Sequence, residues 1–230
     1  MRGMPIRMPR RLKTRAHAGF AVLAMTLSVL AGSASGGKVE APVVAEPPAV
    51  KGPSVARLVD GREGFIITEV PTMDETSHRD FDRAVAMLKD QDYGRAIELL
   101  EKVIGRSPGV TAPYIDIAIA YQRTGKPSLA EEHLQTALKL FPGHPVACNE
   151  YGLLYRKTGR FAEARAIFEK AIERFPDYYP VHKNLGILCD LYLNDPACAL
   201  KHYEIYSKAR PDDAPVPLWI ADVRARQGRK

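Results

Sequence analysis

The 230-residue chain contains few cysteines, a single tryptophan and no apolar run long enough to cross a membrane comfortably. Three cysteines are too few for the dense disulfide framework of a small secreted domain. The longest apolar run, residues 18–30, is shorter than the roughly 20 residues that a membrane-spanning helix needs. A Gly-rich phosphate loop, a nucleophile elbow, an HExxH motif and a paired CxxC are also missing. The sequence therefore favours a binding protein over an enzyme, and we expect no catalytic residue, cofactor or metal.

Acidic residues are absent before Glu40, whereas six basic residues lie in the first 15 positions. This basic start, the apolar run at 18–30 and the small residues after it are typical of a secretory signal peptide. We predict that residues 1–34 are the signal and that cleavage follows Ala34. Ser33 lacks the thiol that lipoprotein processing requires, so a lipid anchor is not expected. The sequence thus predicts an exported, periplasmic protein, anchored to the membrane only if the signal is not cleaved.

The positive charge of the chain belongs to this signal. Six of the 33 lysines and arginines lie there, which leaves 27 basic side chains against 27 acidic ones. A near-neutral mature protein gives no support to nucleic-acid binding, so we expect no nucleic-acid partner.

A linker and a short strap are predicted between the signal and the main domain, over residues 35–76. Residues 36–54 are rich in Pro, Gly, Val and Ala without a helical period, which is typical of an extended tether. Asp60-Gly61 is a turn signal between two short runs of β-prone residues. The strap is therefore either a small hairpin or an extended segment.

From residue 77 onward the sequence repeats itself every 34 residues. The recurring residues are Ala96, Ala130 and Ala164 in one column and Pro108, Pro142 and Pro176 in another. A period of 34 is typical of a solenoid built from helix-turn-helix units. Proline at the end of each unit stops its second helix.

The repeats resemble the tetratricopeptide repeat family, which has a small residue at position 8, an aromatic at 11, Ala at 20 and Pro at 32. The four repeats span 77–110, 111–144, 145–178 and 179–213, and a capping helix is expected in 214–230. The fourth repeat carries one extra residue in its turn, around Asn194. The resemblance implies an all-α fold, a right-handed αα-solenoid of helix-turn-helix repeats.

The resemblance also implies a function. Exported members of this family commonly serve envelope assemblies, so we expect a non-enzymatic interaction scaffold or adaptor in the bacterial cell envelope. Its partner would be another protein or a peptide segment, and no small-molecule substrate is expected.

In this family the first helices of the repeats line a concave groove through positions 2, 5, 6, 9, 12 and 13. Position 9 is an apolar row, position 6 is mainly acidic and position 13 is basic in three repeats. The predicted partner-binding residues are Val85, Ile119, Leu153 and Ile187 at position 9, Asp82, Asp116, Glu150 and Asn184 at position 6, and Lys89, Arg123 and Lys157 at position 13. Such a groove suits an extended or helical partner segment. In the alternative interpretation, the apolar row packs against neighbouring helices and the charges form a solvated face.

Cys189 and Cys198 flank the turn of the fourth repeat. Three interpretations stay open: simple packing, a disulfide formed in an oxidising compartment, and a metal- or thiol-dependent site completed by His182 and His202. Cys148 is expected to be a small buried apolar residue.

Overall fold

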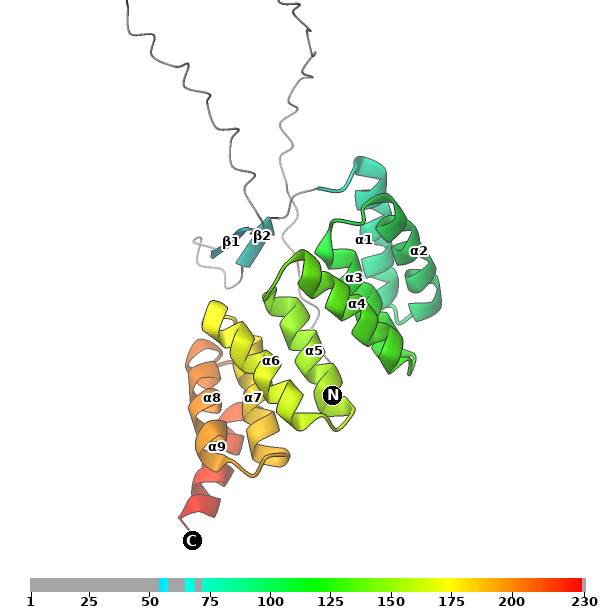
Figure 1. Cartoon of the computed structure of the whole chain (residues 1–230). Helices are drawn as coiled ribbons and strands as arrows, with labels where there is room; N and C mark the ends of the chain where they lie inside the picture. The colour runs from blue at the N-terminus through cyan, green and yellow to red at the C-terminus, as the bar shows by residue number, and fades with distance from the viewer. Residues whose placement is uncertain (1–53, 58–64, 69–71, 229–230) are drawn as a thin grey trace, which may run out of the picture. The chain divides into compact units, whose positions relative to one another are not determined.

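The computed structural model describes residues 54–57, 65–68 and 72–228 (Figure 1). The predicted signal peptide and the Pro-rich linker lie outside the described residues. Strand β1 (Ser54–Arg57) pairs antiparallel with β2 (Phe65–Thr68), with Val55 opposite Ile67. The Asp60-Gly61 turn signal between them also lies outside the described residues.

The rest of the described chain is helical and is arranged as consecutive helix pairs. The first helices of the pairs are α1 (Glu75–Lys89), α3 (Thr111–Arg123), α5 (Pro145–Lys157) and α7 (Tyr179–Leu191). The second helices are α2 (Tyr93–Arg106), α4 (Pro127–Leu140), α6 (Phe161–Arg174) and α8 (Pro196–Ala209), and α9 (Pro215–Gln227) follows them. The all-α repeat fold predicted from the sequence is confirmed.

The starts of the first helices follow the 34-residue period with one difference. Helices α3, α5 and α7 begin at the first residue of their repeats, whereas α1 begins at Glu75, two residues early. The reason is Asp74, whose carboxylate accepts a hydrogen bond of 2.7 Å from the backbone N–H of Ser77 and caps the helix.

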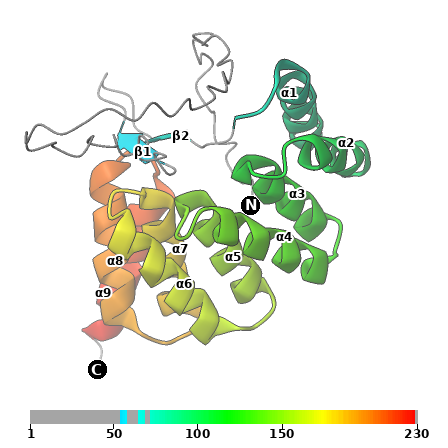
Figure 2. The same ribbon diagram turned by 45° about the horizontal axis from the view of Figure 1, so that its top comes forward.

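Each helix packs against its own partner and against the next pair. The first helices also contact one another in the order α1, α3, α5 and α7, so they form one continuous face (Figure 2). We call this the first-helix face. No helix in the described part of the chain combines the length and the apolar content that crossing a membrane would need.

The two helices of each pair approach closely at position 8 of the repeat. In the first two repeats a buried alanine lies there and a buried leucine occupies position 24; in the last two a glycine is matched by an aromatic ring. The pairs are Ala84 and Leu100, Ala118 and Leu134, Gly152 and Phe168, and Gly186 and Tyr203. A Cβ on Gly152 would lie 2.2 Å from Cε1 of Phe168, and one on Gly186 would lie 2.5 Å from Cδ1 of Tyr203. The larger ring therefore occupies the space that an alanine methyl group would need.

The turn inside each helix pair is closed by a backbone hydrogen bond to the carbonyl oxygen of position 11. In the third repeat the N–H of Arg160 donates to the carbonyl of Tyr155 across a three-residue turn, at 2.8 Å. The fourth turn has four residues, yet the N–H of Asp195 still donates to the position 11 carbonyl, that of Cys189, at 2.9 Å. The residue before this donor keeps the positive φ of the regular turns: Asn194 has a φ of 49°, as Gly125 and Gly159 have φ values of 75° and 78°. Asparagine tolerates this conformation better than most residues.

Helix α9 covers the apolar end of the fourth pair. Val216, Ile220 and Val223 are buried and belong to the same core as α7 and α8. Arg226 forms an ion pair of 2.6 Å with Asp190 on α7. A solenoid end requires a cap of this kind because its last apolar face would otherwise be exposed to water.

The contact between positions 8 and 24 gives a testable prediction. Gly152→Ala should lower the free energy of unfolding by about 1–3 kcal/mol, because the new methyl group overlaps the Phe168 ring. Adding Phe168→Leu should recover part of this loss, because it recreates the alanine–leucine pair of the first two repeats. Urea unfolding followed by circular dichroism measures both effects.

The matched control is Gly105→Ala in α2, where nothing lies within 4 Å of the added Cβ. It should leave stability unchanged or raise it by up to about 1 kcal/mol through helix propensity. Equal effects of the two Gly→Ala changes would contradict the packing argument.

Candidate functional site

A hollow of about 320 Å³ opens on the first-helix face between α3, α5 and the residue that follows α7. Its lining residues are Ile119, Gln122, Arg123, Glu150, Leu153, Arg156, Lys157 and Tyr192. Five of them are predicted groove residues from the second and third repeats. The hollow is thus a mixed surface, lined by the apolar residues Ile119 and Leu153 and by charged and polar side chains.

The predicted residues of the first and fourth repeats do not line this hollow. Asp82, Val85 and Lys89 lie on α1, and Asn184 and Ile187 lie on α7. They belong to the same first-helix face and flank the hollow along the order of the helices.

The apolar row at position 9 is half-buried in every repeat. Leu153 and Ile187 pack against the core of the third and fourth pairs, and Val85 packs against that of the first two. Ile119 contacts a smaller cluster formed by α3, α4 and α5. Part of each side chain therefore stabilises the solenoid and part remains at the surface. Beside the row, Leu191 and Tyr192 are 67% and 46% exposed, which widens the apolar surface near the hollow.

The charged residues do not separate into two independent sides. In the second and third repeats, the acidic residue at position 6 interacts with the basic residue at position 13 of the preceding repeat: Asp116 with Lys89, and Glu150 with Arg123. The pKa of Asp116 is raised to about 7, mainly by burial and also by the nearby Glu150 carboxylate, while the Lys89 charge opposes both effects. Burial also raises the pKa of Glu150, against the effects of its hydrogen bond from Asn149 and of the Arg123 charge.

Hydrogen bonds connect neighbouring repeats across this face. The Asn184 amide donates to Oδ1 of Asn149 at 2.8 Å, and the Asn149 amide donates to Oε1 of Glu150 at 3.1 Å. The ammonium group of Lys157 donates to the backbone carbonyl of Gln122 at 3.0 Å. These contacts fix the orientation of polar groups around the hollow.

The sequence-based prediction missed Gln122, Arg156 and Tyr192. Gln122 and Arg156 occupy position 12, which is one of the concave positions of the family, so listing that column would have found them. Tyr192 follows α7 in the four-residue turn, and no repeat position signals its place in the hollow.

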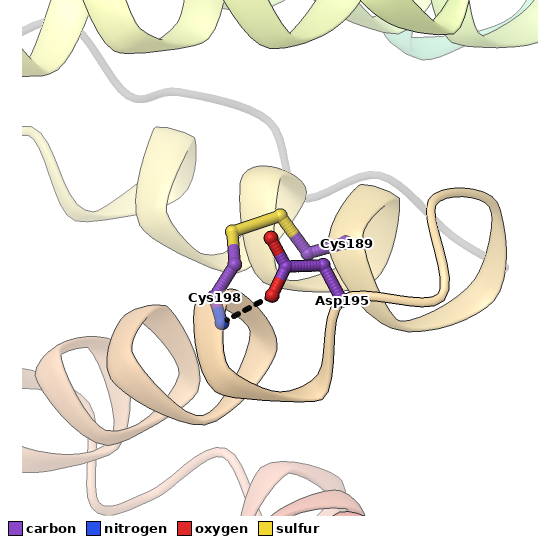
Figure 3. A group of neighbouring side chains, drawn as sticks. All are labelled: Cys189, Asp195 and Cys198. Carbon is purple, nitrogen blue, oxygen red and sulfur yellow. Dashed lines mark hydrogen bonds between the residues drawn. A yellow bond between two sulfur atoms is a disulfide. The ribbon is translucent and has the colours of Figure 1, made fainter.

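A disulfide joins Cys189 on α7 to Cys198 on α8, and their Cα atoms are 5.9 Å apart. The carboxylate of Asp195 lies beside the two sulfur atoms and accepts a hydrogen bond from the backbone N–H of Cys198 at 3.0 Å (Figure 3). Within the described residues this is the one group of at least three metal-ligand side chains with their ligand atoms close together. Bonded sulfurs are not thiolates, so in this state they do not provide the ligands that zinc takes from cysteine.

His182 and His202 pair with each other and not with the cysteines. Their Nδ1 atoms are 2.9 Å apart, and Nε2 of His182 lies 2.9 Å from the carbonyl oxygen of Pro176. Burial lowers the pKa of both rings, that of His202 to about 4. The residues proposed for a four-ligand site therefore form two separate pairs, a disulfide and a buried neutral imidazole pair.

Cys148 is fully buried in α5. Burial raises the pKa of its thiol to about 11, so the thiol is protonated at neutral pH and is a poor nucleophile.

Comparisons with known proteins agree with this architecture. Residues 115–179 match the family model of the tetratricopeptide repeat. No curated protein matches the sequence of this chain.

Many solved structures share the fold. The pilF structure of Pseudomonas aeruginosa superposes with a TM-score of 0.63 at 23% identity, covering 68% of this chain and 71% of that chain. MamA of Desulfovibrio magneticus RS-1 has a TM-score of 0.58 at 16% identity, with coverages of 68% and 88%. A thermophilic tetratricopeptide-repeat protein of Thermus thermophilus has a TM-score of 0.58 at 20% identity, with coverages of 66% and 82%. At these identities the likeness concerns the fold.

The raised pKa of Asp116 predicts a pH-dependent stability difference. Between the usual pKa of 3.8 and the folded value of about 7, the folded protein holds a proton that the unfolded chain releases, so this residue lowers stability as pH rises. Asp116→Asn removes the effect, and its gain in melting temperature over the wild type should increase from pH 4 to pH 7 and then level off. Thermal unfolding across this range measures the gain.

Asp82→Asn, at the same position of the first repeat and exposed, is the matched control. A gain at Asp116 that stays constant or shrinks with rising pH would contradict the prediction.

Proposed function

We propose that this chain, which contains tetratricopeptide repeats, binds an extended segment of a partner protein along the first-helix face. Tetratricopeptide-repeat proteins generally mediate protein–protein interactions. The observation that carries the proposal is the hollow, which is lined by the half-buried apolar residues Ile119 and Leu153 and by charged side chains. Apolar contacts would provide affinity, and the surrounding charges would select the segment and its direction.

The chemistry of the described residues favours binding over catalysis. The one free thiol among them is buried and protonated, and the other two sulfurs are joined. The two carboxylates with raised pKa on the first-helix face, Asp116 and Glu150, lie near cations of the preceding repeat. We therefore propose a non-enzymatic scaffold or adaptor.

The two apolar residues of the hollow give the direct test. Full-length protein carrying Ile119→Asp and Leu153→Asp should lose the proteins that the wild type captures from envelope extracts, because a charge replaces each apolar contact. Leu129→Asp is the matched control, because Leu129 is exposed on α4 and does not line the hollow. Quantitative mass spectrometry of the captured proteins, with circular dichroism to verify helicity, measures the outcome. Equal capture by the double variant and the wild type would discard the first-helix face as the binding surface.

We further propose that the protein is exported and serves an assembly of the bacterial envelope, with the periplasm as its compartment. The support is the basic start and apolar run of residues 1–34, which are typical of a signal peptide. The Cys189–Cys198 disulfide agrees with an oxidising compartment.

Export predicts both the thiol count and the N-terminus of protein recovered from cells. After denaturation without reductant, one thiol, that of Cys148, should react with a maleimide, and three should react after reduction. The mature chain should begin at Ser35. Cys148→Ala should abolish the reaction before reduction. Three reactive thiols without reduction, together with an uncleaved N-terminus, would contradict export.

A further inference from the structure

We propose that the hollow contains a carboxylate-recognition site, formed by Gln122 and Arg156, that receives an aspartate or glutamate side chain from within the partner segment. This inference rests on the proposed function and adds the chemistry of the segment. Peptide binding to the face and carboxylate recognition within it are separate claims, and they are tested separately below.

The two residues present hydrogen-bond donors that nothing in the described part of the chain accepts. Nε2 of Gln122 and one terminal guanidinium nitrogen, Nη1, of Arg156 are buried without a hydrogen-bond partner there. Both residues line the same hollow. Buried donors are nearly always paired in folded proteins, because an unpaired one has lost water without gaining an acceptor. Two such donors in one hollow indicate that an acceptor arrives with the ligand.

The interactions that stabilise the Arg156 charge come from tyrosine side chains. Burial lowers its pKa, and the groups that oppose this effect are the hydroxyls of Tyr192 and Tyr203, not carboxylates. The other two cations of the hollow are already engaged: Arg123 interacts with Glu150, and Lys157 donates to the Gln122 carbonyl. An incoming anion would therefore pair with the positive charge of Arg156.

A carboxylate fits these donors better than other anions do. Its two oxygens can accept from the planar guanidinium and from an amide that lines the same hollow, and such charge-assisted bonds are the strong ones. A phosphate would bring up to two negative charges next to Glu150, which lines the same hollow. A single carboxylate meets less repulsion.

The carboxylate belongs to a side chain inside the segment and not to a chain end. The position 9 row continues on both sides of the hollow, to Val85 on α1 and to Ile187 on α7. A segment that follows this row crosses the hollow in mid-length. Its acidic residue is consequently flanked by apolar residues, which contact Ile119 and Leu153.

The test uses the full chain and three pools of fluorescent nonapeptides. Flanking positions are randomised among Val, Leu, Ala and Ser. The first pool has a central Glu and the second a central Gln, and both are acetylated and amidated; the third has a central Gln and a free C-terminal carboxylate. Fluorescence anisotropy should show the Glu pool binding the wild type about tenfold more tightly than the Gln pool.

Two variants remove this preference by different changes. Arg156→Met deletes the charge, and Gln122→Glu places an acid in the site; each should bring the Glu and Gln pools to nearly equal affinity. Arg224→Met, on α9 and outside the hollow, is the matched control and should keep the tenfold ratio. Circular dichroism verifies that the variants are folded.

The outcomes separate the two claims. Equal binding of the Glu and Gln pools by the wild type, or tighter binding of the third pool, overturns the side-chain carboxylate site while peptide binding to the face stands. If the double variant Ile119→Asp with Leu153→Asp still binds the Glu and Gln pools as the wild type does, the first-helix face is not the binding surface. If no pool binds, both claims are contradicted.

Discussion

The close approach of two helices at position 8 of each repeat is the contact on which the rest of this structure depends. Where that position is glycine, an aromatic ring from the second helix fills the gap, and where it is alanine, the opposing residue is leucine. This contact sets the spacing within a pair. The pairs then pack in series, and their first helices form the surface that contains the hollow.

The sequence predicted the repeat architecture well because its signals are local and periodic. The ends of the second helices follow from the prolines that recur every 34 residues, and the close packing within each pair follows from the recurring small residues. The hollow was predicted only in part, because a column of aligned residues records a position along each helix and not the offset between neighbouring helices. That offset places Glu150 beside Arg123 of the preceding repeat. It also decides which donors, such as Nη1 of Arg156, remain unpaired.

The cysteines illustrate a second limit of sequence reasoning. Packing, a disulfide and a metal site all agree with the spacing of Cys189 and Cys198, because spacing does not specify side-chain direction. In the structure the two sulfurs are joined, and His182 faces His202, on the same two helices. Both pairs link α7 to α8, so they hold together the repeat whose turn departs from the regular length.

The fixed carbonyl acceptor of that turn has an evolutionary consequence. Because Asp195 still reaches the Cys189 carbonyl, an insertion is absorbed within the turn and the register of α8 relative to α7 is preserved. Tyr192, in the same turn, lines the hollow. Insertions and deletions at this point can therefore change the lining of the hollow while the helix pairs keep their packing. Ligand preference and fold stability can then change independently among descendants of this chain.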